Sequence, residues 1–389
     1  MKVAIIHEYF CNMGGSEAVV SVLHQMFPQA PIYTIVAREK HRKNGILKGM
    51  DVRTSFVQHL PFASSRYKLY LPLFPLAVEQ FNLKGYDLVI SSSHSCAKGI
   101  ITRPETLHIC YCHTPMRYAW DLYHDYLDQE IRGRLAKLAA SLLMHYLRLW
   151  DASAAARVDH FIANSEHVAQ RIQKHYRREA TVIYPPVDTD YFLPQNNDGN
   201  FFLMVSRLTS YKRVGLAVAA FNELGLPLKI IGSGPEFKRL KRQANPNVEL
   251  LGWQPREVVR EHFATCRALI FPGQEDFGIV PLEAHSAGRP VIAYAAGGVL
   301  ETVVPGETGV FFEEQTPDSL KEAVIRFQDM KFDKKTIRNH ALRFDRNHFV
   351  ETLKRFIQEK YKLYYDKGTK YPKSELLSAA AGSRTGGRT

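Results

Sequence analysis

Cysteines and long apolar runs are scarce in this sequence. The five cysteines form an odd, scattered set without a Cys-x-x-Cys pair, which argues against a disulfide framework and against a structural zinc site. We expect buried, reduced thiols and a cytoplasmic protein. No stretch of about 18 uncharged apolar residues is present, and the apolar run at residues 3–6 is too short for a signal sequence. We therefore expect neither a membrane-spanning helix nor export by a standard signal.

Fingerprints of dinucleotide and metal enzymes are also missing. The glycine-rich segment at residues 232–235 lacks the third glycine of G-x-G-x-x-G, so an NAD enzyme is disfavoured. No metal motif is assigned, and we expect no metal ligands and no obligatory cofactor. Positive charge, in contrast, is in excess. The net charge of +12 favours a negatively charged partner such as nucleic acid, anionic lipid or a phosphorylated substrate.

Apolar strand-like runs alternate with helical patterns in both halves of the chain. At 389 residues, two domains are the ordinary expectation. Two such series of buried parallel strands predict two doubly wound α/β domains, each binding ligands at the carboxyl edge of its sheet. The predicted strands are residues 3–7, 32–36, 88–92, 107–112 and 160–163, followed by 201–205, 228–231, 248–251, 269–271 and 291–293.

The domain boundary is predicted at the proline-rich segment Tyr184-Pro185-Pro186-Val187-Asp188, which precedes a polar turn cluster. We assign residues 1–184 to the first domain and residues 185–345 to the second. A final helix over about residues 346–367 is expected to pack back on the first domain. Residues 374–389 are small and polar and are expected to form a disordered tail.

Two basic, amphipathic segments allow two interpretations each. Either segment can pack against the protein core or rest on an anionic membrane surface. The sequence favours core packing for residues 131–150 and leaves residues 66–74, which mix basic and aromatic side chains, open. The apolar face of the first segment, at helical spacing, consists of Ile131, Leu135, Leu138, Ala139, Leu142, Leu143, Tyr146 and Leu149.

Two glutamates eight positions apart, Glu275 and Glu283, enclose the most informative motif of the chain. A buried strand precedes them, and a helix is predicted to begin after Gly278. Glu275 then lies on the loop and Glu283 on the first turns of the helix, whose free backbone amides form an anion site. This arrangement suits a sugar nucleotide, because one carboxylate can bind sugar hydroxyls while the other binds ribose hydroxyls.

Further polar residues and glycines follow other predicted strands. Arg207 and Lys212 come after the strand at 201–205, and two cations on one loop suit a pyrophosphate leaving group, where negative charge develops. Gly14 and Gly15 follow the first strand and allow the backbone to approach a phosphate or sugar closely.

Histidines also occupy predicted strand ends. His113 follows the strand at residues 107–112, at the edge where ligands bind in such sheets, and it can hydrogen-bond a sugar hydroxyl or a reacting centre. His7 and His94 lie at other strand ends and are weaker candidates.

Taken in order, these motifs resemble the retaining glycosyltransferases of family 4, whose two Rossmann-like domains face a central cleft in the arrangement called GT-B. The resemblance covers the chain from residue 3 to about residue 365. Each motif alone is weakly specific, whereas their joint order is very specific. The motifs are Gly14-Gly15, His113-Thr114-Pro115, Tyr184-Pro185-Pro186-Val187-Asp188, Ser206-Arg207-Leu208 with Lys212, Gly232-Ser233-Gly234-Pro235, Gly252-Trp253 and the Glu275 to Glu283 run.

The resemblance implies roles for the site residues. It implies that Arg207 and Lys212 bind the donor diphosphate and that Glu283 binds the ribose. Glu275 holds the donor sugar, and His113 contacts that sugar near its anomeric centre. His113, Glu275, Arg207 and Lys212 are thus the expected catalytic residues. The remaining donor-binding set consists of Gly14, Gly15, Gly234 and the backbone of Phe277, Gly278, Ile279 and Val280.

We expect a retaining hexosyltransferase that moves mannose from GDP-mannose to a hydroxyl of a lipid-linked oligosaccharide or polysaccharide. Residues 113–121 and 211–217 resemble the O-antigen mannosyltransferase branch, and a cytoplasmic enzyme on the inner face of the plasma membrane fits that acceptor. A UDP-sugar-dependent GT-B enzyme and a sugar-nucleotide epimerase are the alternatives. A non-enzymatic binder of nucleic acid or membrane is a remote one, since the basic residues are spread rather than gathered in one motif.

Overall fold

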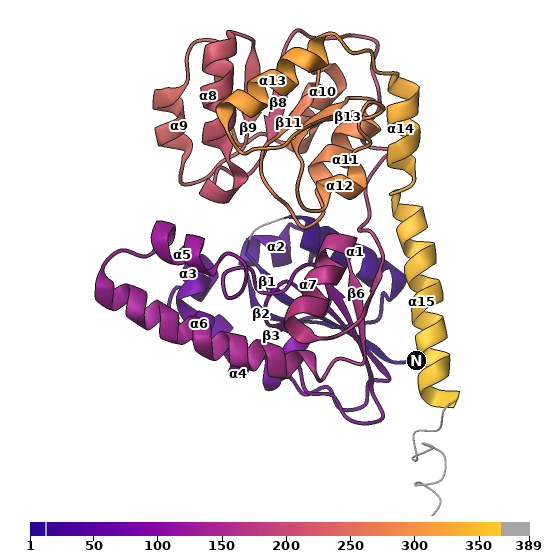
Figure 1. Cartoon of the computed structure of the whole chain (residues 1–389). Coiled ribbons are helices and arrows are strands. Elements are labelled where there is room, and N and C mark those ends of the chain that lie inside the picture. The colour runs from indigo at the N-terminus through magenta and orange to yellow at the C-terminus, as the bar shows by residue number, and fades with distance from the viewer. Residues whose placement is uncertain (12–13, 367–389) are drawn as a thin grey trace, which may run out of the picture. The chain divides into compact units, whose positions relative to one another are not determined.

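The computed structural model describes residues 1–11 and 14–366, without the side chains of residues 129 and 130 (Figure 1). The chain divides into two compact units. The first comprises Met1–Ile162 together with the segment that begins at Glu351, and the second comprises Ala163–Val350. The expected tail at residues 374–389 lies outside the described residues.

The first sheet has seven strands in the order β3-β2-β1-β4-β5-β6-β7. The pairings of β1 with β2 and β4, of β2 with β3 and of β4 with β5 are parallel. The chain leaves β1 toward β2 and β3 and returns on the other side at β4, so the topological switch point lies between β1 and β4. The strands are β1 (Val3–Phe10), β2 (Ile32–Ala37), β3 (Val52–Thr54), β4 (Leu88–Ser93), β5 (Leu107–Cys112), β6 (His160–Ala163) and β7 (Ala180–Val182).

The second sheet has six strands in the order β10-β9-β8-β11-β12-β13, and all neighbouring strands are parallel. Its switch point lies between β8 and β11, because the chain runs to β9 and β10 on one side and returns at β11 on the other. Ligands bind at such points in open α/β sheets. The strands are β8 (Phe202–Val205), β9 (Leu228–Ile231), β10 (Val248–Gly252), β11 (Leu269–Phe271), β12 (Val291–Tyr294) and β13 (Gly309–Phe312).

All ten predicted strands are confirmed, and so is the class of two Rossmann-like α/β domains. The sequence misses β3, β7 and β13. The first two have three residues each, are only half-buried and carry no apolar run, and β13 begins at a glycine at the edge of its sheet. Short strands at the edge of a sheet give a weak sequence signal, because they pair with a neighbouring strand along only one edge.

Helices connect the strands in both units. The first unit contains α1 (Gly15–Met26), α2 (Glu39–Lys43), α3 (Ala63–Arg66), α4 (Phe74–Glu79), α5 (Tyr123–Glu130) and α6 (Arg134–Ala155). The second contains α7 (Glu166–Tyr176), α8 (Val214–Leu224), α9 (Phe237–Gln243), α10 (Arg256–Thr265), α11 (Ile279–Ser286), α12 (Val299–Thr302), α13 (Pro317–Gln328) and α14 (Lys334–Leu342), and α15 (Arg346–Asp366) follows.

The last helix contacts the first unit. The Tyr365 hydroxyl donates its one hydrogen to the carbonyl of Glu105 (2.8 Å) or of Asp87 (3.0 Å), and the ring of Phe356 contacts that of His160. The second unit begins at Ala163, whereas the sequence predicts a boundary after Tyr184. Strand β7 precedes Tyr184 and belongs to the first sheet. A division by sheet membership and a division by contacts between residues therefore place the boundary differently, and the predicted domain bounds stay a prediction.

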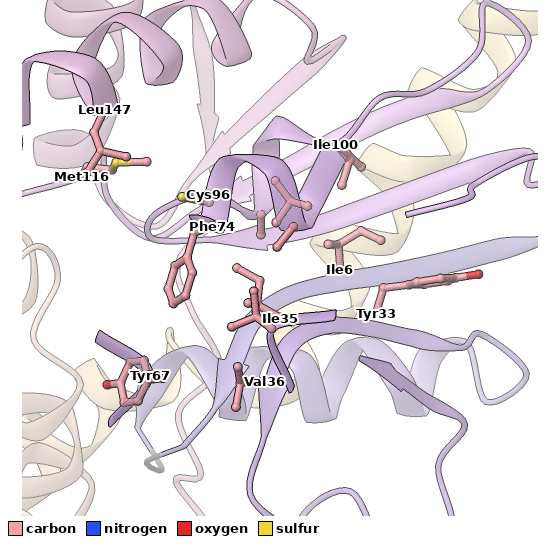
Figure 2. Close-up of a cluster of buried hydrophobic side chains, with 14 of the residues drawn as sticks. Ile6, Tyr33, Ile35, Val36, Tyr67, Phe74, Cys96, Ile100, Met116 and Leu147 are labelled. Atoms are coloured by element: carbon pink, nitrogen blue, oxygen red, sulfur yellow. The ribbon is translucent and has the colours of Figure 1, made fainter. Parts of the chain in front are cut away.

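The core of the first unit lies between the sheet and the helices that cover it. Figure 2 shows Ile6 and Ile35 among buried side chains that include Phe74 of α4, and it shows Leu147 of α6 beside Met116. Tyr67 and Phe74 are buried here, while Leu69 is exposed. Residues 66–74, which the sequence leaves open, therefore contribute to the core and to the surface.

Core packing is the wrong interpretation for the predicted apolar face of residues 131–150. The face of α6 that meets the core consists of Met144, Leu147, Ala154 and Ala155. Of the predicted face, Leu143 packs against the core, whereas the other members that are large and exposed are Leu135, Leu138, Leu142, Tyr146 and Leu149. The sequence cannot distinguish the two, because both faces of α6 carry apolar residues at helical spacing.

A buried ion pair anchors α6 to the rest of the unit. Lys98 pairs with Asp151, both side chains are almost fully buried, and Asp151 also accepts a hydrogen bond from Trp120 (2.8 Å). Burial disfavours a charged amine, but the Asp151 carboxylate outweighs this effect and raises the pKa of Lys98. Lys98 is therefore charged, and the pair joins α6 to the turn after β4 and to the loop after β5.

Candidate functional site

Backbone-to-backbone packing shapes the carboxyl edge of the second sheet. A Cβ atom on Gly234 would lie 2.2 Å from the Leu208 carbonyl oxygen, and one on Gly232 would also overlap the Ser206 carbonyl. The loop that carries Arg207 is further held by a hydrogen bond from the Leu208 amide to the Ser233 carbonyl (3.0 Å). Only glycine allows so close an approach, so Gly234 positions the Arg207 loop.

The loop after β11 depends on a second pair of glycines. Cβ atoms on Gly297 and Gly298 would lie 2.4 Å from the Glu275 carbonyl oxygen and 2.3 Å from that of Asp276. The Gly298 amide donates to the Glu275 carbonyl at 2.9 Å. The backbone that presents Glu275 is therefore fixed by the loop after β12, a contact for which the sequence motif alone gives no signal.

The basic residues predicted for the diphosphate have different surroundings. Arg207 is exposed on the loop after β8. Lys212, which is 21% exposed, forms an ion pair with Glu275, which is 15% exposed. The structure thus brings Lys212 and Glu275 together at the switch point between β8 and β11. Arg213 adopts a left-handed conformation (φ 54°) at the N-terminus of α8 and donates to Gln315 instead (3.2 Å), so Lys212 is the better candidate.

Helix α11 begins one residue after Gly278, as the sequence predicts. Gly278 has φ 95°, a conformation that favours glycine. The Phe277 side chain is buried and its ring lies 5.5 Å from that of Tyr184, so only its backbone is available to a ligand. The first amides of α11, including those of Ile279 and Val280, have no partner within the helix and lie at the positive end of its dipole.

Glu283 lies in the second turn of α11 and is half-buried. Burial raises its pKa to about 7, although the Arg256 guanidinium favours the ionised form. Arg256 itself pairs with Asp188 at 2.8 Å, which reduces that effect. Glu283 therefore exchanges its proton near neutral pH.

Contacts that the sequence analysis misses hold Asp276, the neighbour of Glu275. Arg171 of α7 pairs with the Asp276 carboxylate at 2.6 Å, and the Ser165 hydroxyl donates to the Asp276 carbonyl at 2.6 Å. Nothing in the sequence pairs residues 105 positions apart.

His113 lies at the end of β5, in the first unit. Its Nε2 atom forms a hydrogen bond with the Ser92 hydroxyl (2.8 Å), and its amide donates to the Ser93 carbonyl (2.8 Å). Burial, followed by the nearby His94 and His7 rings, lowers the pKa of His113 to about 3. His113 is therefore neutral at physiological pH, and it can donate or accept a hydrogen bond but does not supply positive charge.

A buried carboxylate, Glu8, organises the histidines around the first switch point. Its Oε1 atom accepts from the Ser93 hydroxyl and from the amides of His94, Ser95 and Ala97 at 2.8 to 3.1 Å. Its Oε2 atom lies 3.1 Å from His94 Nδ1. Burial alone would raise the pKa of Glu8, but His94, His7 and the Ala97 amide hold it well below its usual range. A charged residue inside an apolar strand is the signal that would have identified it.

Gly14 is the N-cap of α1, and Gly15 is the first residue of that helix. Glu17, in the first turn of α1, is buried. Its Oε1 atom lies 3.8 Å from His7 Nε2, and its Oε2 atom lies 3.0 Å from the Ser16 hydroxyl. Burial opposes ionisation of Glu17, but His7 lowers its pKa. The first unit therefore gathers His7, Glu8, Glu17, His94 and His113 at one sheet edge.

An Asp-x-Asp triplet does occur in the chain, at Asp188-Thr189-Asp190. Asp188 pairs with Arg256 and the Thr189 hydroxyl donates to Asp345 (2.6 Å). In the part of the chain that the structure describes, no group of His, Cys, Asp and Glu is arranged to hold a metal ion.

The predicted site residues therefore form two groups, one at the switch point of each sheet. Comparison with known proteins decides the family. Residues 13–191 match the model for Glycosyltransferase Family 4, and residues 190–344 match that for Glycosyl transferases group 1. The two models together cover residues 13–344. The chain belongs to the family 4 glycosyltransferases. Anabaena HepE in complex with UDP, at a TM-score of 0.68 and 15% identity, covers 92% of this chain and 100% of its own, and shows the GT-B fold.

Two curated relatives of this glycosyltransferase are mannosyltransferases. The alpha-1,3/1,6-mannosyltransferase ALG2 of Saccharomyces cerevisiae is 27% identical over 92% of this chain and 82% of its own length. The GDP-mannose-dependent alpha-(1-6)-phosphatidylinositol monomannoside mannosyltransferase of Mycolicibacterium smegmatis is 30% identical over 36% of this chain and 44% of its own. The chain spans 56%, 20% and 46% of the lengths of three other curated relatives that it matches.

Proposed function

We propose that this glycosyltransferase transfers mannose from GDP-mannose to a hydroxyl of a lipid-linked glycan, with retention of the anomeric configuration. The observation that carries the proposal is the switch-point arrangement of Lys212, Glu275 and the α11 N-terminus. Mannose, GDP and a lipid acceptor are supported by the names of the two mannosyltransferase relatives. A peripheral location on an anionic inner membrane face is part of the same proposal.

The negative charge of the departing diphosphate is stabilised by Arg207, Lys212 and the first amides of α11. A diphosphate that binds here competes with Glu275 for the Lys212 ammonium. Glu275 is then released toward the sugar hydroxyls, while the lysine neutralises charge on the leaving group. The same ion pair therefore accounts for two of the roles that the family resemblance implies.

Retention follows when the acceptor hydroxyl attacks from the face that the diphosphate leaves, and the diphosphate oxygen takes the hydroxyl proton. No covalent nucleophile is needed in this scheme. Neutral His113 contributes a hydrogen bond near the anomeric centre rather than a proton for the leaving group, because its pKa of about 3 keeps it unprotonated. Protein cations replace a metal, so we propose that no metal is required.

Nucleotide affinity is expected to rise with pH through about 7. An ionised Glu283 accepts hydrogen bonds from two ribose hydroxyls, and its pKa of about 7 means that part of the free protein must first lose a proton. The gain approaches about tenfold per pH unit below 7 and vanishes above it. Isothermal titration with GDP from about pH 5.5 to about pH 8.5, a range that brackets the Glu283 pKa of about 7, measures this change in affinity.

The control for this experiment is Glu283→Gln, which keeps the shape and removes the proton exchange. The terminal phosphate of GDP also titrates near about pH 6, and the Gln variant reports that contribution alone. An identical pH dependence in both proteins would contradict the assignment of Glu283 to the ribose.

A transfer assay tests the proposed reaction. GDP-mannose, UDP-glucose and UDP-galactose are offered with polyprenyl diphosphate-linked acceptors after treatment with EDTA, and the linkage of the product is determined by NMR. The expected result is an α-mannoside formed at an undiminished rate in EDTA. Loss of activity on chelation with recovery in Mn²⁺ would overturn the metal-free scheme, a β-linked product would overturn retention, and transfer only from a UDP-sugar would overturn the donor.

A further inference from the structure

An apolar stripe runs along the solvent-exposed side of α6. Its members are between 46% (Tyr146) and 83% (Leu135) exposed. At 100° per residue they lie on one side of the helix, opposite the residues that meet the core. The stripe, which we call the α6 stripe, consists of Leu135, Leu138, Leu142, Tyr146 and Leu149.

The charged side chains that α6 itself exposes are basic, and one of them, Lys137, pairs with Asp128 of α5. Arg134 and His145 are exposed on the flank of the stripe. Asp151 is the one carboxylate of α6, and it is buried against Lys98 on the opposite face. The surface of this helix is therefore apolar and basic without an exposed acid, the composition of a helix that lies in a membrane interface.

Helix α6 is also rigidly joined to the candidate site of its own unit. Arg148 donates to the Ala119 carbonyl (2.9 Å), and Trp120 donates to Asp151 (2.8 Å). Both partners belong to the loop that follows His113. In Figure 1 the N-terminal part of α6 extends beyond the strands of the first sheet. Contact between α6 and a surface would thus fix the position of the His113 loop relative to that surface.

We infer that the α6 stripe docks this glycosyltransferase on an anionic lipid bilayer, with the leucines in the interface and Arg134 and His145 against lipid phosphates. A second copy of the chain is the other occupant that an apolar stripe can attract, but α6 has no exposed carboxylate of its own to pair with the basic groups of a second copy. No helix in residues 1–11 and 14–366 is long and apolar enough to cross a bilayer. The inference deepens the peripheral membrane location in the proposed function, and it rests on that function for the lipid-linked acceptor.

Co-sedimentation with vesicles of phosphatidylcholine and about 30% phosphatidylglycerol tests the inference on the full chain. The wild type is expected to bind, to bind phosphatidylcholine alone much more weakly, and to lose affinity as salt rises. The triple variant Leu135→Ser, Leu138→Ser, Leu142→Ser is expected to bind on the order of a hundredfold less tightly. The matched control, Leu193→Ser, Ile325→Ser, Leu342→Ser, changes exposed apolar residues of the second unit and is expected to bind like the wild type.

Equal vesicle binding by both triple variants, or no binding by the wild type, would overturn the inference. Sedimentation equilibrium adds the remaining outcome, since a wild-type dimer that the α6 variant converts to a monomer would assign the stripe to a second copy. Urea unfolding in the Trp253→Phe background, followed by the fluorescence of Trp120 and Trp150, verifies that the first unit of the α6 variant is folded. If the wild type transfers sugar to a soluble acceptor but does not bind vesicles, the inference is refuted and the proposed transfer reaction stands. If the wild type binds vesicles but transfers sugar from no sugar nucleotide, the proposed function is refuted and the inference stands.

Discussion

Replacing Glu275 by alanine is expected to lower turnover by on the order of 10²- to 10³-fold, while the affinity for GDP is not reduced. The Glu275 carboxylate pairs with Lys212. The backbone of the loop that carries it packs closely against Gly297 and Gly298. Loss of the carboxylate removes an acceptor for the sugar hydroxyls and leaves the lysine for the diphosphate. Single-turnover kinetics with GDP-mannose, together with GDP titration, measure the two effects separately.

Glu307→Ala serves as the control for this substitution, because Glu307 is an exposed carboxylate of the same unit. Near-normal turnover of the Glu275→Ala protein would show that the assigned role is wrong. A loss of GDP affinity equal to the loss of turnover would instead place Glu275 in nucleotide binding.

Replacing Lys98 by alanine is expected to lower the free energy of unfolding of the first unit by about 3–5 kcal/mol. The substitution leaves the Asp151 carboxylate buried without its charged partner, and Asp151 ties α6 to Trp120. Urea unfolding is followed by tryptophan fluorescence in a Trp253→Phe background. The signal then comes from Trp120 and Trp150 of the first unit, because Trp253, exposed in the second, is the third tryptophan of the chain.

Lys137→Ala is the matched control, since Lys137 also lies on α6 and pairs with a carboxylate, Asp128, at the surface. Its cost is expected to stay below about 1 kcal/mol. The double variant Lys98→Met, Asp151→Asn removes both charges and keeps an oxygen for Trp120, and it is expected to recover much of the loss. Equal costs for Lys98→Ala and Lys137→Ala would refute the role of the buried pair.

Strand positions were predictable because the strands are parallel and buried on both faces, so apolar residues such as those at 3–6 and 88–90 occur in uninterrupted runs. Helix α6 was assigned correctly as a helix but with the wrong face toward the core. The exposed leucines and the core residues Met144 and Leu147 recur with the same helical period. A single sequence therefore does not show which of the two faces packs against the protein. Burial, and not periodicity, decides the question.

The candidate site was predictable where short-range motifs determine it. Glu275, Gly278 and Glu283 lie on one strand-loop-helix unit, and the structure places them as the spacing predicts. The ion pair of Lys212 with Glu275 and the anchoring of Asp276 by Arg171 were not predictable, because they join residues far apart in the chain. The roles of the site residues in catalysis, and the meeting of the two groups across a cleft, stay predictions.

The measurement that tests the central claim most directly is a calorimetric comparison of GDP, UDP and ADP binding to the wild type and to Glu283→Gln. The claim predicts that GDP binds most tightly, that binding needs no added metal, and that Glu283→Gln weakens all three nucleotides through the shared ribose. Tighter binding of UDP or ADP than of GDP, or nucleotide affinity unaffected by Glu283→Gln, would contradict it.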